Sequence, residues 1–283
     1  MPRLLHRLAR SLLHCYPWPR GQGRIVDRTW LSRLRFDEPT LKARCSDGFE
    51  MTIIPDDHIG RHLYLTGQFD RTIVEVLRSY CRGGERILDI GANVGYVSCA
   101  LLHLVPQSRV VCVEPNPQVY RILAGNVAAL GGDRAKALNL AVSDHDGTGA
   151  MTLHPGNTGA NQIVDPAGAA DGATIPVALI SGPKLFELSG LDRLDLIKID
   201  VEGHEQAVLR SLAPVIQQQR PRAVVFEHEG NLADPGSVIG GVFAQAGYQI
   251  FGIEKCLLRW SLKNVRDLLG SRRPAHDYVA LPA

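Results

Sequence analysis

The chain has 283 residues, of which 45% are hydrophobic and 21% charged, so it is long enough for one large domain or for one domain with an extension. Lysine and arginine number 31 against 29 for aspartate and glutamate, so there is no net field to concentrate a polyanion, and nucleic acid is not expected as a substrate. The six cysteines include no C-x-x-C pair, which indicates reduced thiols in a reducing compartment, and we expect a cytoplasmic protein.

The first sixteen residues alternate arginine with leucine, and no acid precedes Asp27, a pattern that predicts an amphipathic basic helix. A secretory signal is not expected, because a continuous apolar segment and a small-residue cleavage site are both missing. The commonest arrangement is a helix that packs its leucine face on the body of the protein. A transit peptide and a helix in weak contact with a membrane surface are the alternatives. We expect no transmembrane segment, because no apolar stretch is long enough.

Residues 17–80 carry the signals of several short elements. Two runs within residues 43–54 flank Asp47-Gly48, which is hairpin chemistry, and residues 55–57 close the hairpin as a turn. Residues 72–80 place apolar side chains on one helical face. We therefore expect residues 1–80 to form an N-terminal extension that covers a site in the main domain, residues 81–283.

The stretch 87–96 reads Ile-Leu-Asp-Ile-Gly-Ala-Asn-Val-Gly-Tyr and predicts a strand, a tight turn and a helix that stops before Pro106. Gly91 and Gly95 lack a Cβ, so a ligand can lie against the main chain beside the N–H groups that open the helix. A close-packed turn without a ligand is the alternative interpretation.

The ligand of such a turn is indicated by what accompanies its glycines. The dinucleotide fingerprint is not met, because its third and sixth positions, counted from Gly91, hold Asn93 and Tyr96. An acid followed by glycine, asparagine and glycine (Asp89, Gly91, Asn93, Gly95) is instead typical of the loop that Rossmann-like methyltransferases wrap around S-adenosylmethionine. We expect these four residues to bind that cofactor.

Residues 109–113 are the predicted second strand, which ends at Glu114. Asn116 is expected to cap a helix that starts at Pro117 and stops at Gly131-Gly132. A carboxylate at Glu114, a little over twenty positions beyond the turn, can accept hydrogen bonds from both ribose hydroxyls, so Glu114 and Asn116 join the cofactor set. The alternative for Glu114 is a solvated acid before a helix that favours its charge.

A third strand is predicted over residues 137–143 and ends at Asp144, which we expect near the adenine amine of the cofactor. Residues 147–176 are predicted as loops with room for a hairpin. Further strands are expected over residues 194–200, 223–227, 248–253 and 277–281. Helices are expected over residues 205–212, where Pro214 interrupts, and 237–246. The fold class is therefore α/β with a Rossmann-like sheet.

Acids end five of the predicted strands, and ligands of open parallel sheets bind beyond those ends. They are Asp89, Glu114, Asp144, Asp200 and Glu227. Such a crowd of like charge is costly without a cation, and a sulfonium ligand supplies one.

The richest segment for chemistry is Asp200-Val201-Glu202-Gly203-His204-Glu205. Methyl transfer to a hydroxyl requires an aligned acceptor oxygen and removal of its proton. His204 is favoured as the base, with Asp200 or Glu202 orienting it, and Glu227 and His228 are weaker candidates. A divalent metal held by Asp200, Glu202 and His204 is a less favoured alternative. In a third, His204 only caps the helix and the acids are solvated.

Three strings carry a resemblance to a known family: residues 87–95 (ILDIGANVG), 113–117 (VEPNP) and 197–205 (IKIDVEGHE). They resemble the FkbM-type S-adenosylmethionine-dependent methyltransferases, and the resemblance covers about residues 43–283. It implies a seven-strand sheet with the last strand antiparallel and O-methylation of a saccharide or a polyketide-type natural product. Residues 67–70 and 177–183 depart from the family pattern and are expected near the acceptor. A nicotinamide oxidoreductase and a non-catalytic nucleotide-binding module remain the alternatives.

With that topology, residues 254–276 project over the site, and they carry Lys255, Arg259, Trp260, Lys263, Arg266, Arg272 and Arg273. We expect this loop to recognise an anionic acceptor, such as a sugar nucleotide or a carrier-bound substrate. A solvated basic helix is the alternative.

Overall fold

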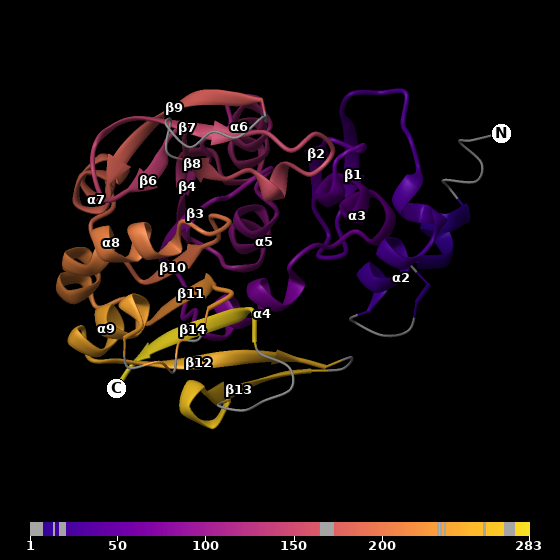
Figure 1. Ribbon diagram of the computed structural model, residues 1–283. Coiled ribbons are helices and arrows are strands. Elements are labelled where there is room, and N and C mark those ends of the chain that lie inside the picture. The colour runs from indigo at the N-terminus through magenta and orange to yellow at the C-terminus, as the bar shows by residue number, and fades with distance from the viewer. Residues whose placement is uncertain are drawn as a thin grey trace.

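The computed structural model describes residues 8–13, 15–16, 21–164, 173–230, 232, 234, 236–256, 259–268 and 275–283. Its centre is a twisted sheet of eight strands in the order β13-β12-β14-β11-β10-β3-β4-β5 (Figure 1). The bounds are β3 Arg86–Ile90, β4 Arg109–Val113, β5 Ala135–Leu138, β10 Leu196–Ile199, β11 Ala223–Glu227, β12 Tyr248–Lys255, β13 Trp260–Asn264 and β14 Asp277–Pro282.

The expected seven strands are all present, and the last of them, β14, pairs antiparallel with both β11 and β12. The predicted number is wrong by one, because β13 adds an eighth strand antiparallel to β12. This strand lies inside residues 254–276, which the sequence analysis treats as a projecting loop. Its residues alternate between more and less exposed positions, the period of a strand with one solvated face.

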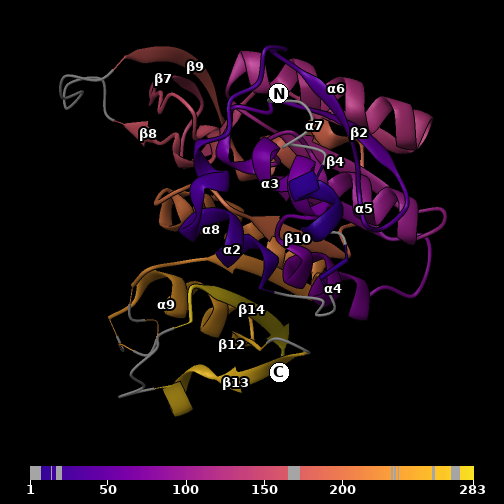
Figure 2. The same ribbon diagram turned by 90° about the vertical axis from the view of Figure 1, so that its right-hand side faces the viewer.

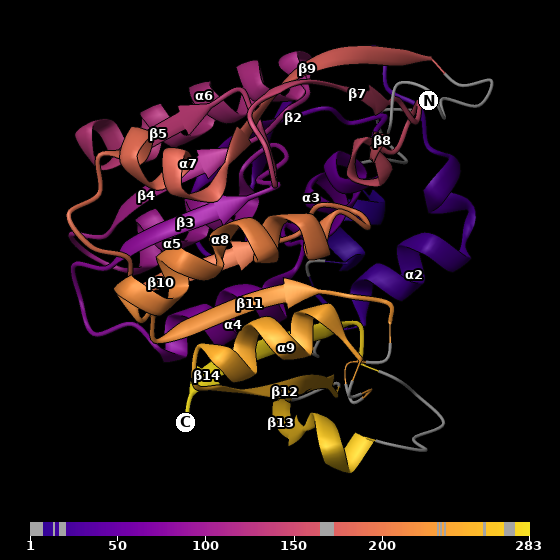
Figure 3. The same cartoon turned by 60° about the vertical axis from the view of Figure 1, so that its left-hand side comes forward.

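Helices cover both faces of the sheet, as the alternation of apolar side chains along its strands requires (Figure 3). Ile87, Val110 and Leu196 face the helices α4, α5 and α6. Leu88 and Ile197 face α7, α8 and α9. The helices are α4 Arg71–Ser79, α5 Tyr96–Leu104, α6 Pro117–Gly131, α7 Gly182–Ser189, α8 Glu205–Gln219 and α9 Val238–Gln245.

Most helix ends follow the predicted chemistry. Asn116 caps α6, because its side chain accepts a hydrogen bond from the Gln118 N–H, and Pro117 is the first helical residue. The prediction that Pro214 ends α8 is wrong: the helix continues to Gln219. Leu212 and Val215 are buried on either side of the proline, so packing holds the helix across the missing N–H.

The predicted third strand is two strands in two sheets. β5 ends at Leu138 in the central sheet, and β6 (Ala141–Ser143) pairs with β9 (Thr174–Ser181) in a second sheet of order β6-β9-β7-β8. β7 (Gly147–Thr152) and β9 pair antiparallel, which confirms a hairpin-like pairing in the region predicted as loops. β8 is Ile163–Val164, and the 3₁₀ turns η2 (Gly132–Arg134) and η3 (Thr158–Ala160) connect neighbouring elements.

The N-terminal part lies at the end of the sheet toward which the parallel strands point (Figures 1 and 2). It comprises α2 (Gln22–Arg28), η1 (Trp30–Arg33), the predicted hairpin β1 (Leu41–Arg44) and β2 (Glu50–Ile53), and α3 (His58–Thr66). Met51 and Ile53 of the hairpin share one hydrophobic core with α5 and α6. Helix α3 is not predicted by the sequence analysis.

The helix predicted at the N-terminus is described over residues 8–13. Ala9 and Leu13 are buried in a cluster with Val26 and Leu65, whereas Leu8 and Leu12 are exposed, so the described leucine face packs only in part. Leu4 and Leu5 lie outside the described residues. Within the described part of the chain, none of the helices has the length and apolarity that crossing a bilayer needs.

Candidate functional site

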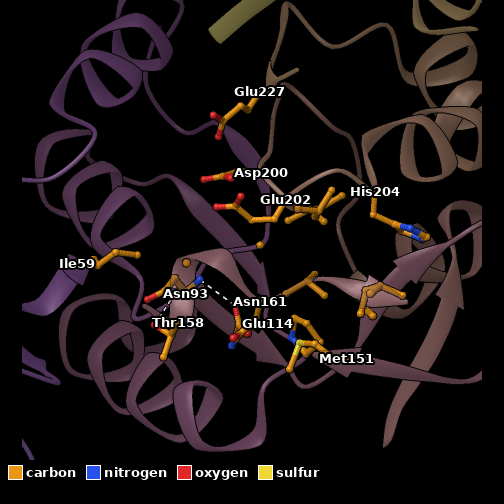
Figure 4. Close-up of a pocket in the computed structure, with 18 of the residues that line it drawn as sticks. Ile59, Asn93, Glu114, Met151, Thr158, Asn161, Asp200, Glu202, His204 and Glu227 are labelled. Atoms are coloured by element: carbon orange, nitrogen blue, oxygen red, sulfur yellow. Dashed lines mark hydrogen bonds between the residues drawn. The ribbon is translucent and has the colours of Figure 1, made fainter. Parts of the chain in front are cut away.

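A cavity of about 320 Å³ lies beyond the carboxyl ends of β3, β4, β10 and β11. We call it the main cavity. Ile90 and Gly91, Val113 and Glu114, Asp200 and Glu227 bring the ends of those four strands to it. The loop around η3 and the start of α3 form its opposite wall, through Thr158 and Ile59 (Figure 4). Ligand sites of open α/β sheets occupy this edge, as the sequence analysis expects.

Gly91 stands in the turn after β3, as expected. The reason for a glycine there is packing within the protein and not only the approach of a ligand. Gly91 has φ 74°, and a Cβ there would lie 1.7 Å from the Asp200 carbonyl oxygen. The neighbouring loop of the protein therefore excludes a side chain at this position, whatever ligand is bound. A Cβ at Gly95 would lie 2.6 Å from Leu123 Cδ1, so this glycine is also required by packing. Gly91 lines the main cavity.

Asn93 and Glu114 join the turn to the end of β4. The Asn93 N–H donates to Glu114 Oε2 over 3.0 Å, and the Asn116 N–H donates to Oε1 over 2.9 Å. Asn93 also has φ 49°, and its amide donates to Thr158 Oγ1 across the cavity over 3.1 Å. Burial raises the pKa of Glu114 to about 7, although both N–H donors favour its charged form. Glu114 is thus a buried acid that two N–H donors orient, and within the described part of the chain no lysine or arginine forms an ion pair with it.

Asp89 does not line the main cavity. Its carboxylate is buried beside Lys198, with Oδ1 3.3 Å from Nζ, and Ser98 Oγ donates to Oδ2 over 2.6 Å. Lys198 Nζ also lies 3.3 Å from the Asp200 carboxylate and donates to the Gly91 carbonyl over 2.7 Å. The expectation that only a ligand offsets the acids at the strand ends is therefore corrected, because Lys198 provides a resident cation beneath the cavity.

Four other carboxylates meet at the far end of the main cavity, namely Asp70, Asp200, Glu202 and Glu227. In Figure 4 the labelled Asp200, Glu202 and Glu227 gather there, away from Glu114. Burial and neighbouring acids raise the pKa of Asp70 and of Glu202 to about 7, and that of Glu227 to about 8. With Glu114, five carboxylates line the cavity, and no lysine or arginine side chain of the described residues does.

His204 lines the main cavity but points away from these carboxylates (Figure 4). Its Nε2 lies 3.1 Å from the hydroxyl of Ser143 at the end of β6. Ser143 therefore orients the imidazole in place of the expected Asp200 or Glu202. Burial lowers the pKa of His204, so the ring is neutral near pH 7. Because His204 points away from the carboxylates, the predicted metal site is not formed. The donor atoms of Asp200, Glu202 and His204 do not lie close enough together to share an ion.

Several predicted residues lie outside the main cavity. Gly95 and Asn116 are among them, the latter because its side chain caps α6. Asp144 is exposed at the end of β6 and pairs with His145 over 2.8 Å, since the split of the third strand moves it away from the central sheet. His228 faces a separate small pocket. Leu140 to Val142 line the main cavity where Asp144 was expected.

Neither Asp70 as a site residue nor Lys198 as a cation is predicted from the sequence. Asp70 lies within the departure at residues 67–70, which was expected near the acceptor, and it lines the cavity. The other departure, residues 177–183, does not. Backbone angles single out part of the wall: Asp70, Asn93 and Glu202 all have φ between 46° and 49°. Left-handed backbone at residues other than glycine is uncommon and clusters at functional sites.

A second cavity of about 530 Å³, the side cavity, shares Asp70, Asp200 and Glu227 with the main cavity. Arg24 of α2 and Lys255 of β12 also line it. The predicted basic loop contributes less than expected: Lys255 pairs with Asp277, and Lys263 Nζ pairs with Glu254 over 2.9 Å. Arg259 is exposed and does not line this cavity. Arg272, Arg273 and the side chain of Arg266 lie outside what the structure describes.

The sequence profile described as the Methyltransferase FkbM domain matches residues 89–269. Methyltransferase sdnD of Sordaria araneosa is 30% identical over an alignment of 193 residues, which covers 53% of this chain and 72% of that protein. Hexuronic acid methyltransferase AglP of Haloferax volcanii is 25% identical over 59% of this chain and 65% of its own length. The 2-O-methyltransferase NoeI of Sinorhizobium fredii is 30% identical over 44% of this chain and 55% of its own. The chain thus spans less than two thirds of the last two proteins.

Proposed function

Since this chain belongs to the FkbM methyltransferase family, we propose that it transfers the methyl group of S-adenosylmethionine to a hydroxyl of a saccharide or small natural product. The observation that carries this proposal is the charge of the main cavity. Among the residues that the structure describes, five carboxylates and no lysine or arginine line it, so a cationic ligand is favoured and a pyrophosphate is not. S-adenosylmethionine supplies an electrophilic methyl group on a positively charged sulfur.

The residues present fit such a cofactor. The volume of the main cavity is within the range of small-molecule sites. Gly91 and Asn93 present bare main chain and an amide at one end, and the oriented carboxylate of Glu114 is suited to accept hydrogen bonds from ribose hydroxyls. We therefore assign cofactor binding to Gly91, Asn93 and Glu114. Asp89, Gly95 and Asn116 act on it indirectly, by holding the turn and the Glu114 carboxylate.

We assign the proton acceptor to Glu227, with Glu202 as its neighbour. Glu227 lines both cavities, and Glu202 lines the main cavity. A hydroxyl that enters from the side cavity would reach the main cavity beside these two carboxylates. A general base works best when its pKa lies near the working pH, and the pKa of Glu227 is raised to about 8. His204, the base favoured from the sequence, is engaged with Ser143 and is a weaker candidate.

The acceptor is proposed to enter through the side cavity and to carry an anionic group. Arg24 provides positive charge at its wall, whereas Lys255 is paired with Asp277. The names of two relatives support this: one is a hexuronic acid methyltransferase, which names a sugar acid, and the other a 2-O-methyltransferase, which names transfer to an oxygen. We further propose that residues 1–80 act as the cover of this entrance, because Arg24 belongs to α2.

The proposal is tested by incubating the protein with S-adenosylmethionine and pairs of acceptors, and measuring released S-adenosylhomocysteine. Each pair consists of a saccharide with a hexuronic acid and its neutral counterpart. We expect acceptor-dependent release that is faster with the anionic member. Arg24→Glu should raise KM for that member, whereas Arg28→Glu, on the same helix but outside the cavity, should not. A reduction of NAD without such release would favour an oxidoreductase, and ligand binding without turnover a non-catalytic module.

A further inference from the structure

Three side chains of types that ligate metals meet at the edge of the main cavity: Asp27, His58 and His62. Each offers one donor atom, and these atoms all lie within 4.8 Å of one another. Asp27 belongs to α2, and the two histidines stand one turn apart on α3. His62 Nε2 lies 2.7 Å from Asp27 Oδ1, and His58 Nδ1 lies 3.9 Å from the same oxygen. Within the described residues, no other group of three such side chains comes this close.

We propose that Asp27, His58 and His62 bind a divalent transition-metal ion of the Zn²⁺ class. Two imidazoles and one carboxylate are a donor set that suits this ion, with a water molecule as the fourth ligand. Calcium and magnesium are disfavoured, because they prefer a shell of oxygen atoms. The ion binds Nε2 of the neutral His62 ring, whose single proton then resides on Nδ1, so bonds from both residues to the ion replace the His62–Asp27 hydrogen bond and no proton is released.

The hydrogen bond between His62 and Asp27 does not explain why His58 lies beside the pair. The His58 ring lies 4.5 Å from the His62 ring, centroid to centroid, and its side chain is only partly exposed. A second imidazole therefore stands beside the first, close enough to the Asp27 carboxylate to complete a set of three ligands.

The backbone of α2 approaches the cluster closely. A Cβ at Gly23 would lie 3.3 Å from His62 Nδ1 and Cε1, so glycine lets the helix lie against the imidazole. Asp27 and His62 line a pocket between α2 and α3, and His58 lines the main cavity beside Phe69. A bound ion would therefore fasten α2 to α3 at the edge of the main cavity. This inference does not depend on methyl transfer.

The test is a calorimetric titration of untagged, chelator-treated protein with Zn²⁺, followed by Co²⁺ as a spectroscopic probe. We expect one ion per chain, a higher unfolding temperature with Zn²⁺, and Co²⁺ absorption bands typical of four-coordinate nitrogen and oxygen ligation. His58→Ala and Asp27→Asn should each weaken Zn²⁺ binding at least about tenfold. His58→Ala is the decisive variant, because it leaves the buried His62 in place.

His145→Ala is the matched control, because His145 also pairs with an aspartate, Asp144, over 2.8 Å but has no third ligand in reach. It should bind Zn²⁺ as the unaltered protein does. Circular dichroism checks that each variant is folded. The proposal is overturned if the unaltered protein binds no Zn²⁺ at micromolar concentration, or if folded His58→Ala and Asp27→Asn bind it as tightly as the control.

Discussion

Lys198 and Asp89 stand directly opposite each other on the neighbouring strands β10 and β3, with Nζ 3.3 Å from Oδ1. Both side chains are buried, and the lysine extends the contact to the Asp200 carboxylate and to the Gly91 carbonyl. The Lys198 ammonium group therefore links strand β3 to the loops that follow β3 and β10, and both loops line the main cavity. Burial lowers the pKa of Lys198, but Asp89 and Asp200 together raise it above its ordinary value, so the lysine stays charged.

Replacing this cation should be costly. We expect Lys198→Met to lower the free energy of unfolding by about 3–5 kcal/mol, because Asp89 then remains a buried charge that keeps the hydrogen bond from Ser98 but has lost its cation. Lys198→Met combined with Asp89→Asn should recover more than half of that loss, since no buried charge is left unpaired. Urea unfolding of the three variants measures both values. A double variant as unstable as the single one would contradict the pairing.

Gly91→Ala should destabilise the protein by more than about 2 kcal/mol, because the new Cβ would meet the Asp200 carbonyl at 1.7 Å in a left-handed backbone conformation. Gly125→Ala is the matched control. That residue lies in α6 with open space around its Cβ position, so alanine there should stabilise by up to about 1 kcal/mol. Thermal and urea unfolding provide the comparison. Equal effects at both positions would refute the steric argument for Gly91.

The unfolding free energy should fall as the pH rises from about 5 to about 8. The pKa values of Glu202 and Glu227 in the folded protein are about 7 and about 8, above the ordinary value of 4.5. The folded state therefore holds protons in this range that the unfolded chain has already released, and a higher pH removes this advantage. Glu227→Gln should flatten the dependence. Urea unfolding at several pH values tests it, and a stability that rises with pH across the window would be inconsistent with these pKa shifts.

The two candidate bases should differ in their effect on turnover. We expect Glu227→Gln to lower kcat by about 10²–10⁴-fold, the usual contribution of a general base, and His204→Gln by less than about tenfold. In the unaltered protein, kcat/KM should rise with pH as the Glu227 carboxyl, with its pKa of about 8, loses its proton. Initial rates from pH 6 to pH 9 measure both effects, in variants checked for folding. The opposite ranking would assign the base to His204.

Local chemistry made much of the fold predictable from the sequence. Asn116 and Pro117 start α6, and the Asp47-Gly48 turn joins β1 to β2, because short-range hydrogen bonds and backbone angles decide such features. Tertiary contacts decided the rest. Helix α8 passes through Pro214 because its flanks are buried, and α3 contains Gly60, whose Cβ would lie 1.7 Å from the Ile54 carbonyl oxygen.

The site residues that lie at the ends of parallel strands were predictable from the sequence. Glu114, Asp200 and Glu227 reach the main cavity because parallel strands end at the same edge of the sheet. The direction of a side chain within that edge was not predictable. Asp89 points into the layer of α5, where Lys198 meets it, and His204 turns toward Ser143. Lys198 and Ser143 each lie more than sixty positions along the chain from the side chain that they contact. The spacing of residues within a motif therefore does not predict these contacts.

The most direct test of the proposed function is a calorimetric titration of the folded protein with S-adenosylmethionine, with NAD as the comparison ligand. The five carboxylates of the main cavity predict saturable binding of one S-adenosylmethionine per chain, weakened in Glu114→Gln, and no comparable binding of NAD. Absence of binding to both S-adenosylmethionine and S-adenosylhomocysteine, in protein whose fold is verified by circular dichroism, would contradict the claim that this cavity receives a sulfonium cofactor.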